Sequence, residues 1–231
     1  MIPINNLLDP LFECDFKNVY YPSDDSYLLI DYFKKTIDNN YFDGIPLEEI
    51  KYILDMGTGT GIIAILFELI KSHIPKFNPK IYASDILGDS IKCAKENEKR
   101  NNINEKIIYI HSDLFKSFPH TVKSTFNIIV FNPPYLPSLS TINERFQKKN
   151  IDYSWEGGIR GIEITREFIR TMGKYLNLTK PHYVYYISSS KSELDELEIG
   201  IKNMGYECEQ LEKVHKFFED IILNRLKYIK V

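Results

Sequence analysis

The residues best suited to chemistry are four consecutive ones, Asn132-Pro133-Pro134-Tyr135, which follow an apolar segment of strand length. The side-chain oxygen of Asn132 and the backbone carbonyl of Pro133 can each accept one N–H of an NH₂ group, and the two prolines hold these acceptors rigidly. Tyr135 can stack on a planar group. Because an amide or exocyclic amino nitrogen is a poor nucleophile, such a site would act by holding it against an electrophile. A plain Asn-Pro turn after a strand is the alternative interpretation.

A second motif is a glycine-rich turn, in which the apolar segment Tyr52–Met56 runs into Gly57-Thr58-Gly59-Thr60-Gly61 and then into an apolar helix. Glycine lets the backbone approach a ligand closely, although a tight strand-to-helix turn needs glycine in any case. Ile62 stands where a dinucleotide-binding fingerprint has its third glycine. The spacing, with Asp55 two residues before the first glycine, resembles motif I of the Rossmann-like methyltransferases. That resemblance implies an acidic side chain near the cationic amino group of S-adenosylmethionine.

Two further acids follow the next expected strands. Asp85 ends Tyr82-Ala83-Ser84-Asp85, where a carboxylate can accept both ribose hydroxyls of the cofactor. Asp113, with its neighbour Leu114, follows the third strand at the motif position that contacts the adenine amino group. Each aspartate taken singly could be a turn or helix cap. Three acids at successive strand ends, where open α/β sheets bind ligands, together favour a cofactor site that also includes Asn132.

The motifs must be positioned by secondary-structure elements, and along the sequence predicted strands alternate with predicted helices. Short apolar segments, each followed by a helix-length amphipathic segment, predict a parallel sheet covered by helices on both faces. The expected strands are Tyr52–Met56, Ile81–Asp85, Ile107–His111, Asn127–Phe131 and Tyr183–Ser188. The expected helices lie near Gly61–Ser72, Asp89–Asn101, Ile162–Leu176 and Ser192–Met204.

Both ends of the chain depart from this alternation. Ser23-Asp24-Asp25-Ser26 leads into an apolar segment and predicts a capped helix ahead of the sheet. Glu207–Val214 and Phe218–Ile229 predict two strands joined by a turn at Lys216, so that the sheet ends in an antiparallel hairpin. Pro133–Asn150 is a long irregular segment of the kind that is usually functional or mobile. The predicted fold is therefore α/β and Rossmann-like, with a mostly parallel sheet and a C-terminal antiparallel hairpin.

Composition restricts the class of protein. With 231 residues, 43% of them hydrophobic, the chain suffices for one domain, in which residues 1–50 form an N-terminal extension and capping helix and residues 51–231 the Rossmann-like part. The net charge of −3 disfavours a dedicated duplex-DNA binder. Cys14, Cys93 and Cys208 lack metal-ligand spacing, so we expect reduced core thiols and no metal site. The longest apolar run, Ile62–Phe67, is too short to span a membrane, and we expect a soluble cytoplasmic protein.

With these residues assembled, the chain resembles the HemK-like protein glutamine methyltransferases of the short archaeal and eukaryotic type. Asn18–Leu29 matches the family segment V-Y-x-P-x-x-D-[ST]-x-L-L, which places Ser26 at a cofactor-contacting position. Ser154–Gly158 matches a W-x-G-G stretch, in which Trp155 either lines the substrate pocket or is a core aromatic. Gly161-Ile162-Glu163 departs from the G-R-[DE] of many relatives. Motif I begins near residue 55, which favours the short branch over the bacterial members with a separate helical domain.

The resemblance implies transfer of a methyl group from S-adenosylmethionine to the glutamine amide of the Gly-Gly-Gln motif in a class-one translation termination factor. It also implies a small zinc-binding activator subunit that covers apolar surface near the first strands. Adenine-N6 methylation of DNA or RNA is the main alternative, because the same tetrapeptide serves both nitrogens, but no basic run or target-recognition domain supports it. Lysine methylation fits the tetrapeptide poorly, since a lysine ammonium is not planar. A non-enzymatic scaffold would predict damaged motifs, and all are present.

Overall fold

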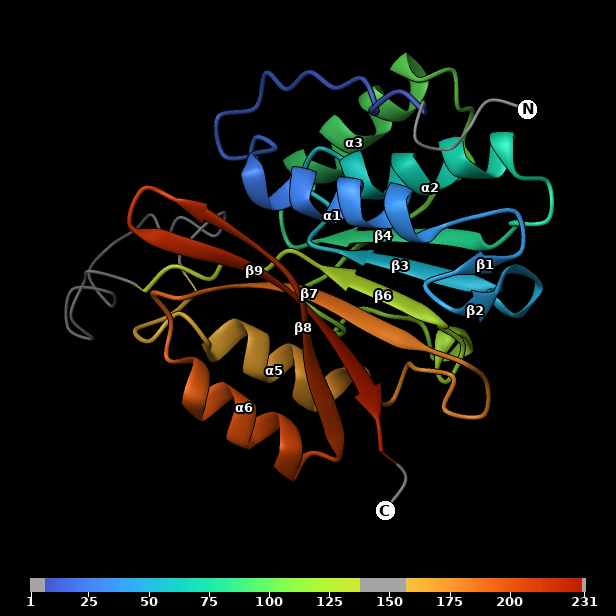
Figure 1. Cartoon of the computed structure of the whole chain (residues 1–231). Coiled ribbons are helices and arrows are strands. Elements are labelled where there is room, and N and C mark those ends of the chain that lie inside the picture. The colour runs from blue at the N-terminus through green and yellow to red at the C-terminus, as the bar shows by residue number, and fades with distance from the viewer. Residues whose placement is uncertain (1–6, 138–156, 230–231) are drawn as a thin grey trace.

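The computed structural model describes residues 7–137 and 157–229 and has a seven-stranded sheet at its centre (Figure 1). The strand order is β5-β4-β3-β6-β7-β9-β8. β3 to β7 are parallel to one another, whereas β9 runs antiparallel to both β7 and β8. The strands are β3 Tyr52–Met56, β4 Lys80–Asp85, β5 Ile108–His111, β6 Ile128–Phe131, β7 Tyr183–Ser189, β8 Tyr206–Lys216 and β9 Glu219–Tyr228.

Helices cover both faces of the sheet. Figure 1 shows α1, α2 and α3 on one face and α5 and α6 on the other. Their bounds are α1 Asp24–Thr36, α2 Ile62–His73, α3 Gly88–Arg100, α5 Glu163–Met172 and α6 Leu194–Asn203. A two-stranded ladder, β1 Tyr41–Phe42 and β2 Ile45–Pro46, and two 3₁₀ turns, Leu47–Glu49 and His120–Val122, complete the described elements. No helix in the described ranges is long and apolar enough to cross a membrane.

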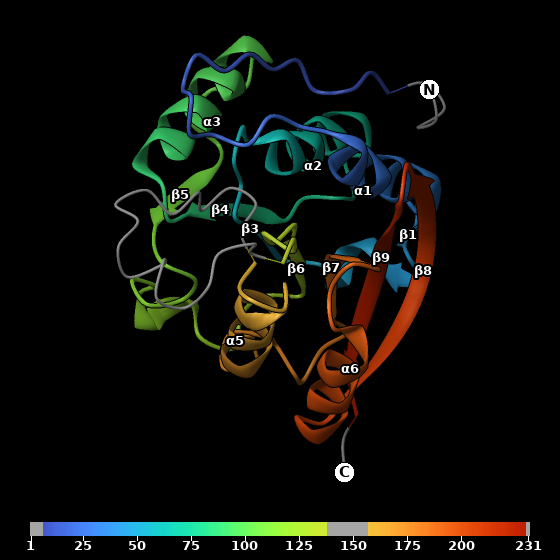
Figure 2. The ribbon, with the colours of Figure 1, turned by 90° about the vertical axis from the view of Figure 1, so that its left-hand side faces the viewer.

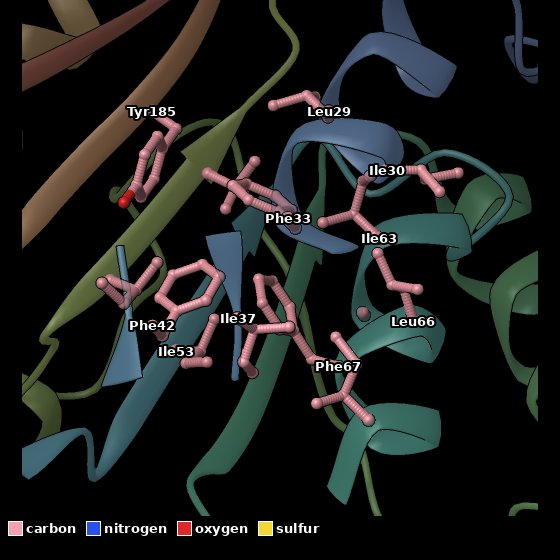
Figure 3. Close-up of a cluster of buried hydrophobic side chains, with 14 of the residues drawn as sticks. Leu29, Ile30, Phe33, Ile37, Phe42, Ile53, Ile63, Leu66, Phe67 and Tyr185 are labelled. Carbon is pink, nitrogen blue, oxygen red and sulfur yellow. The ribbon is translucent and has the colours of Figure 1, made fainter. Parts of the chain in front are cut away.

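The residues ahead of the sheet share its hydrophobic core. Phe33 of α1 is fully buried and meets the ring of Tyr185 on β7 edge to face, with centroids 5.1 Å apart (Figure 3). Phe67 of α2 lies 5.2 Å from Phe33, so one aromatic cluster joins α1, α2 and β7. Burying each such ring contributes about 1.5–3 kcal/mol. The division of the chain at residue 50 stays a prediction.

The predicted α/β fold with its terminal hairpin is confirmed, but local details differ. Ser23 is the N-cap of α1, yet its side chain makes no capping hydrogen bond. The capping prediction is wrong because Asp25 Oδ1 accepts the Ser26 N–H that the Ser23 side chain would otherwise bind. The hairpin turns at Phe217–Phe218 and not at Lys216, which still pairs with Glu219. Only Cys93 among the cysteines is fully buried, so the expectation of three core thiols is wrong for Cys14 and Cys208, which are half-buried.

Candidate active site

A pocket opens where β3, β4 and β6 end, at the edge of the sheet that the sequence predicts to bind ligand. Figure 2 views the molecule from that side. The expected site residues that line the pocket are Ser26, Asp55, Gly57, Gly59, Asp85, Asp113, Leu114, Asn132, Pro133, Pro134 and Tyr135. Segments far apart in the sequence therefore converge on one cavity.

Gly61 is the exception, because it is not among the lining residues. Its φ is +85°, and a Cβ at this position would lie 2.9 Å from the Cβ of Ala94 on α3. Only glycine therefore allows α2 to begin this close to α3. Gly57, in contrast, lies in the pocket with a φ of +65°, and a Cβ there would approach the Phe131 ring at 3.1 Å.

Asp55 is buried at the end of β3 and is held by local donors. Thr58 Oγ1 donates to Asp55 Oδ2 at 2.6 Å, and the Ala64 N–H donates to the same atom at 3.2 Å. Burial raises the pKa of this carboxyl to about 7, although the two hydrogen bonds act in the opposite direction. A cation in the pocket would favour the ionised form of Asp55.

Asp85 links the end of β4 to the glycine-rich turn. Its Oδ2 accepts the Gly59 N–H at 2.9 Å and its Oδ1 accepts the Leu87 N–H at 2.8 Å. Burial raises the pKa of Asp85 above its usual value. The Ser90 side chain and the Ile86 N–H also favour the ionised form of this carboxyl, which lines the pocket.

Asp113 and Leu114, which follow β5, also line the pocket. The Asp113 side chain is partly exposed and makes an ion pair with Lys116 at 2.5 Å. Leu114 has a φ of +47°, a conformation that is uncommon for a side chain of this kind. Strained residues of this type gather at ligand sites, and here the strained residue lies in the pocket wall.

The side-chain oxygen of Asn132 is buried and has no hydrogen-bond partner among the residues that the structure describes. Buried polar atoms are nearly always paired, and an unpaired acceptor loses about 1–3 kcal/mol of hydration. Asn132 also lines the pocket. The arrangement can therefore accept an N–H from a ligand placed there.

Asp25 anchors the tetrapeptide, a role that the sequence reasoning missed. Tyr135 donates its hydroxyl to Asp25 Oδ2 at 3.0 Å, and Tyr20 donates to the same atom at 2.9 Å. Asp25 Oδ1 accepts the Ser26 N–H at 2.6 Å. Burial and the neighbouring carboxylate raise the pKa of Tyr135, so its hydroxyl stays protonated as a donor. Both Tyr20 and Asp25 stand in the segment matched to the family, but spacing alone does not reveal their contact with Tyr135.

The stretch that begins at Gly157 packs directly against the tetrapeptide Asn132–Tyr135. The Gly157 N–H donates to the Leu136 carbonyl at 3.0 Å, and a Cβ on Gly157 would collide with the Pro134 carbonyl oxygen. Ser192 Oγ donates to the Tyr135 carbonyl at 2.7 Å. Sequence reasoning identified the glycines by resemblance but not Ser192. Trp155 lies outside the described residues.

Ile162 stands where the family pattern has arginine, and Glu163 beside it keeps the acidic position. Its carboxylate accepts the backbone N–H groups of Arg160, at 3.3 Å, and of Ile162, at 3.2 Å. These bonds, together with ion pairs from Arg160 to Glu163 and Glu196, fold the loop that carries Gly161. The Arg160 side chain therefore stabilises this loop.

The mostly parallel sheet carries a glycine-rich turn and acidic residues at its carboxyl edge. Beside them lies the Asn132 side-chain oxygen, which has no partner in the described part of the chain. This combination is that of a Rossmann-like methyltransferase. Residues 28–158 match the family model described as "Methyltransferase small domain". A Methanocaldococcus jannaschii protein named as a protein N5-glutamine methyltransferase is 32% identical over 205 residues, covering 89% of each chain. The chain belongs to this family of protein glutamine methyltransferases and is an enzyme that uses S-adenosylmethionine.

Two further comparisons agree with the family and the fold. A release factor glutamine methyltransferase of Bacillus cereus is 29% identical over 56% of this chain and 44% of its own length. The Mtq2-Trm112 complex of E. cuniculi, described as responsible for methylation of the eRF1 translation termination factor, superposes with a TM-score of 0.62. That match has 18% identity and covers 91% of this chain and 99% of the other, so it supports the fold alone.

Proposed function

We propose that this enzyme methylates the side-chain amide of the glutamine in the Gly-Gly-Gln motif of a class-one translation termination factor in the cytoplasm. The observation that carries the proposal is the buried Oδ1 of Asn132, which has no partner within residues 7–137 and 157–229 and belongs to a residue that lines the pocket. A primary amide NH₂ supplies the donor that this acceptor lacks. The Bacillus cereus relative named for release factors supports the substrate class.

The residues at the strand ends fit the cofactor. The carboxylate of Asp55 would hold the cationic amino group, and the carboxylate of Asp85, which also lines the pocket, would accept ribose hydroxyls. Ser26, Asp113 and Leu114 would contact the remainder of the ligand. When bound, S-adenosylmethionine supplies an electrophilic methyl group on a sulfonium.

The tetrapeptide would prepare the nitrogen for attack. Asn132 Oδ1 and the Pro133 carbonyl each accept one N–H of the substrate amide, while the Tyr135 ring stacks on its plane. Asp25 and Ser192 fix Tyr135 from its hydroxyl and its backbone carbonyl, respectively. The acceleration then comes from orientation of the amide and exclusion of water.

A small zinc-binding activator is the partner that we propose. β5 forms an edge of the sheet in the described part of the chain, and Ile108 on this strand is 41% exposed. An edge strand leaves backbone N–H and C=O groups open to pairing with another chain. The Mtq2-Trm112 neighbour is itself a two-protein complex. Co-expression with the activator should raise the yield of monodisperse enzyme; a lone chain that is monodisperse and fully active would overturn the partner proposal.

The deciding experiment is transfer of labelled methyl to the termination factor of the same organism. We expect incorporation with the native Gly-Gly-Gln loop and none when its glutamine is replaced by asparagine. Methylation should fall only modestly between low and physiological salt, because recognition does not depend on release of counterions from a phosphate backbone. Incorporation into DNA or RNA with a steep dependence on salt would instead establish the adenine-N6 alternative.

A further inference from the structure

The turn of the β8–β9 hairpin presents two exposed aromatic rings. Lys216 pairs with Glu219, so Phe217 and Phe218 alone form the loop, and they are 92% and 91% exposed. Phe217 has a φ of +53°, and Phe218 is not among the positive-φ residues. A two-residue turn with positive φ at its first position normally carries glycine there. A bulky aromatic residue is strained in that conformation, and such strain is commonly retained for a function.

The turn lies beside the active site. Lys216 makes an ion pair with Asp24 at 3.0 Å, and Asp24 directly precedes the Asp25 that holds Tyr135. On the other strand, the Asp220 N–H donates to Ser190 Oγ at 2.8 Å, two residues before the Ser192 that holds the Tyr135 carbonyl. Figures 1 and 2 show the hairpin turn at the same side of the molecule as the carboxyl ends of the parallel strands, next to the start of α1.

We propose that Phe217 and Phe218 form a docking contact for the protein that carries the target glutamine, an inference that rests on the proposed function. A glutamine on a short glycine-rich loop can enter the pocket only if the body of the substrate lies against the rim around it. The two rings project from that rim and would insert into an apolar groove of the termination factor next to its Gly-Gly-Gln loop. Buried aromatic residues dominate the affinity of such contacts.

The test uses the enzyme together with its activator and the intact termination factor. In Phe217→Ser/Phe218→Ser we expect the KM for the factor to rise about tenfold or more, as hot-spot aromatic residues imply, while kcat and affinity for S-adenosylmethionine stay unchanged. Ile199→Ser is the matched control, because Ile199 is 62% exposed on α6, away from the turn. Its KM should equal that of the wild type.

Phe217→Gly separates docking from folding. Glycine suits the positive φ, so the unfolding temperature should stay level or rise, yet the KM for the factor should still increase. A wild-type KM in both hairpin variants would overturn the docking proposal, as would a change in self-association that accounts for any difference. If the wild-type enzyme leaves the factor unmethylated, the proposed function fails first and the docking inference fails with it.

Discussion

Tyr135→Phe tests whether the hydroxyl of Tyr135 positions the tetrapeptide. The substitution keeps the ring that would stack on the substrate and removes only the hydrogen bond to Asp25, whose length is 3.0 Å. Asp25 is 2% exposed and would keep its bonds from Tyr20 and Ser26. Losing one hydrogen bond to a buried charged group lowers the free energy of unfolding by about 1.5–3 kcal/mol.

The effect on turnover follows from geometry. Without the hydroxyl contact, Tyr135 loses its hydrogen bond to α1 and keeps the Ser192 bond to its carbonyl and the packing of its ring against the hydrophobic core. A misplacement of about 1 Å in a positioned group reduces the rate about 100-fold, so we expect kcat to fall about 10- to 100-fold with little change in cofactor affinity. Combined with Asp25→Asn, the two changes should be coupled by about 1–2 kcal/mol.

Chemical denaturation and steady-state kinetics measure the two effects separately. Tyr20→Phe is the matched control, because Tyr20 donates to the same Asp25 oxygen at 2.9 Å but lies outside the tetrapeptide. It should lose comparable stability and keep turnover within about threefold, since the catalytic backbone is not displaced. Equal losses of turnover in the two variants, or strictly additive effects with Asp25→Asn, would refute the positioning role.

Three more substitutions test the cofactor and nitrogen sites. Asp85→Ala should weaken the binding of S-adenosylmethionine by about 1.5–3 kcal/mol, as measured by calorimetry. An unchanged affinity would mean that Asp85 only stabilises the turn at Gly59. Asn132→Ala should leave cofactor affinity nearly unchanged and lower turnover by several powers of ten, because this group would act on the nucleophile. A variant that keeps more than about a tenth of the wild-type turnover would contradict the mechanism. Because the pKa of Asp55 is about 7 and the neutral carboxyl cannot pair with a cation, cofactor affinity should rise with pH up to about 7 and then level off. Asp55→Asn should flatten this profile, which calorimetry at stepped pH will show.

The sequence predicts the strand and helix order well because the apolar periods are strong. β3 spans the predicted Tyr52–Met56, and the glycine turn follows it as expected. Local sequence pattern does not predict a feature that tertiary contacts override. Ser23 has the composition of a cap but makes no capping bond, since Asp25 accepts the Ser26 N–H in its place. The other oxygen of Asp25 accepts the hydroxyl of Tyr135, a residue 110 positions away. The β1–β2 ladder has only two residues in each strand and gives no periodic signal.

The candidate site shows the same division between local and distant constraints. Motif spacing identifies Asp85 and Asn132 because each follows a strand whose end the sheet brings to one edge. It cannot identify Ser192. The sequence around a serine near the start of a predicted helix does not show whether its hydroxyl caps the helix or bonds to a distant carbonyl, as it does here. Gly61 illustrates the converse, since a glycine expected to approach the ligand is required instead for contact with α3.

The contacts around the tetrapeptide explain how a site without a strong base could act on an amide. Asp25 accepts a hydrogen bond from the hydroxyl of Tyr135, Ser192 donates one to its carbonyl, and Gly157 packs against Pro134. The backbone is thus fixed from three directions, while Asn132 Oδ1 is left without a partner in the described structure. An acceptor left unpaired in this way destabilises the free enzyme. In the proposed mechanism an incoming amide N–H would relieve the penalty only in the orientation that the fixed backbone dictates. Binding and alignment of the nitrogen would then be one event, and a substrate lacking the NH₂ group would gain neither.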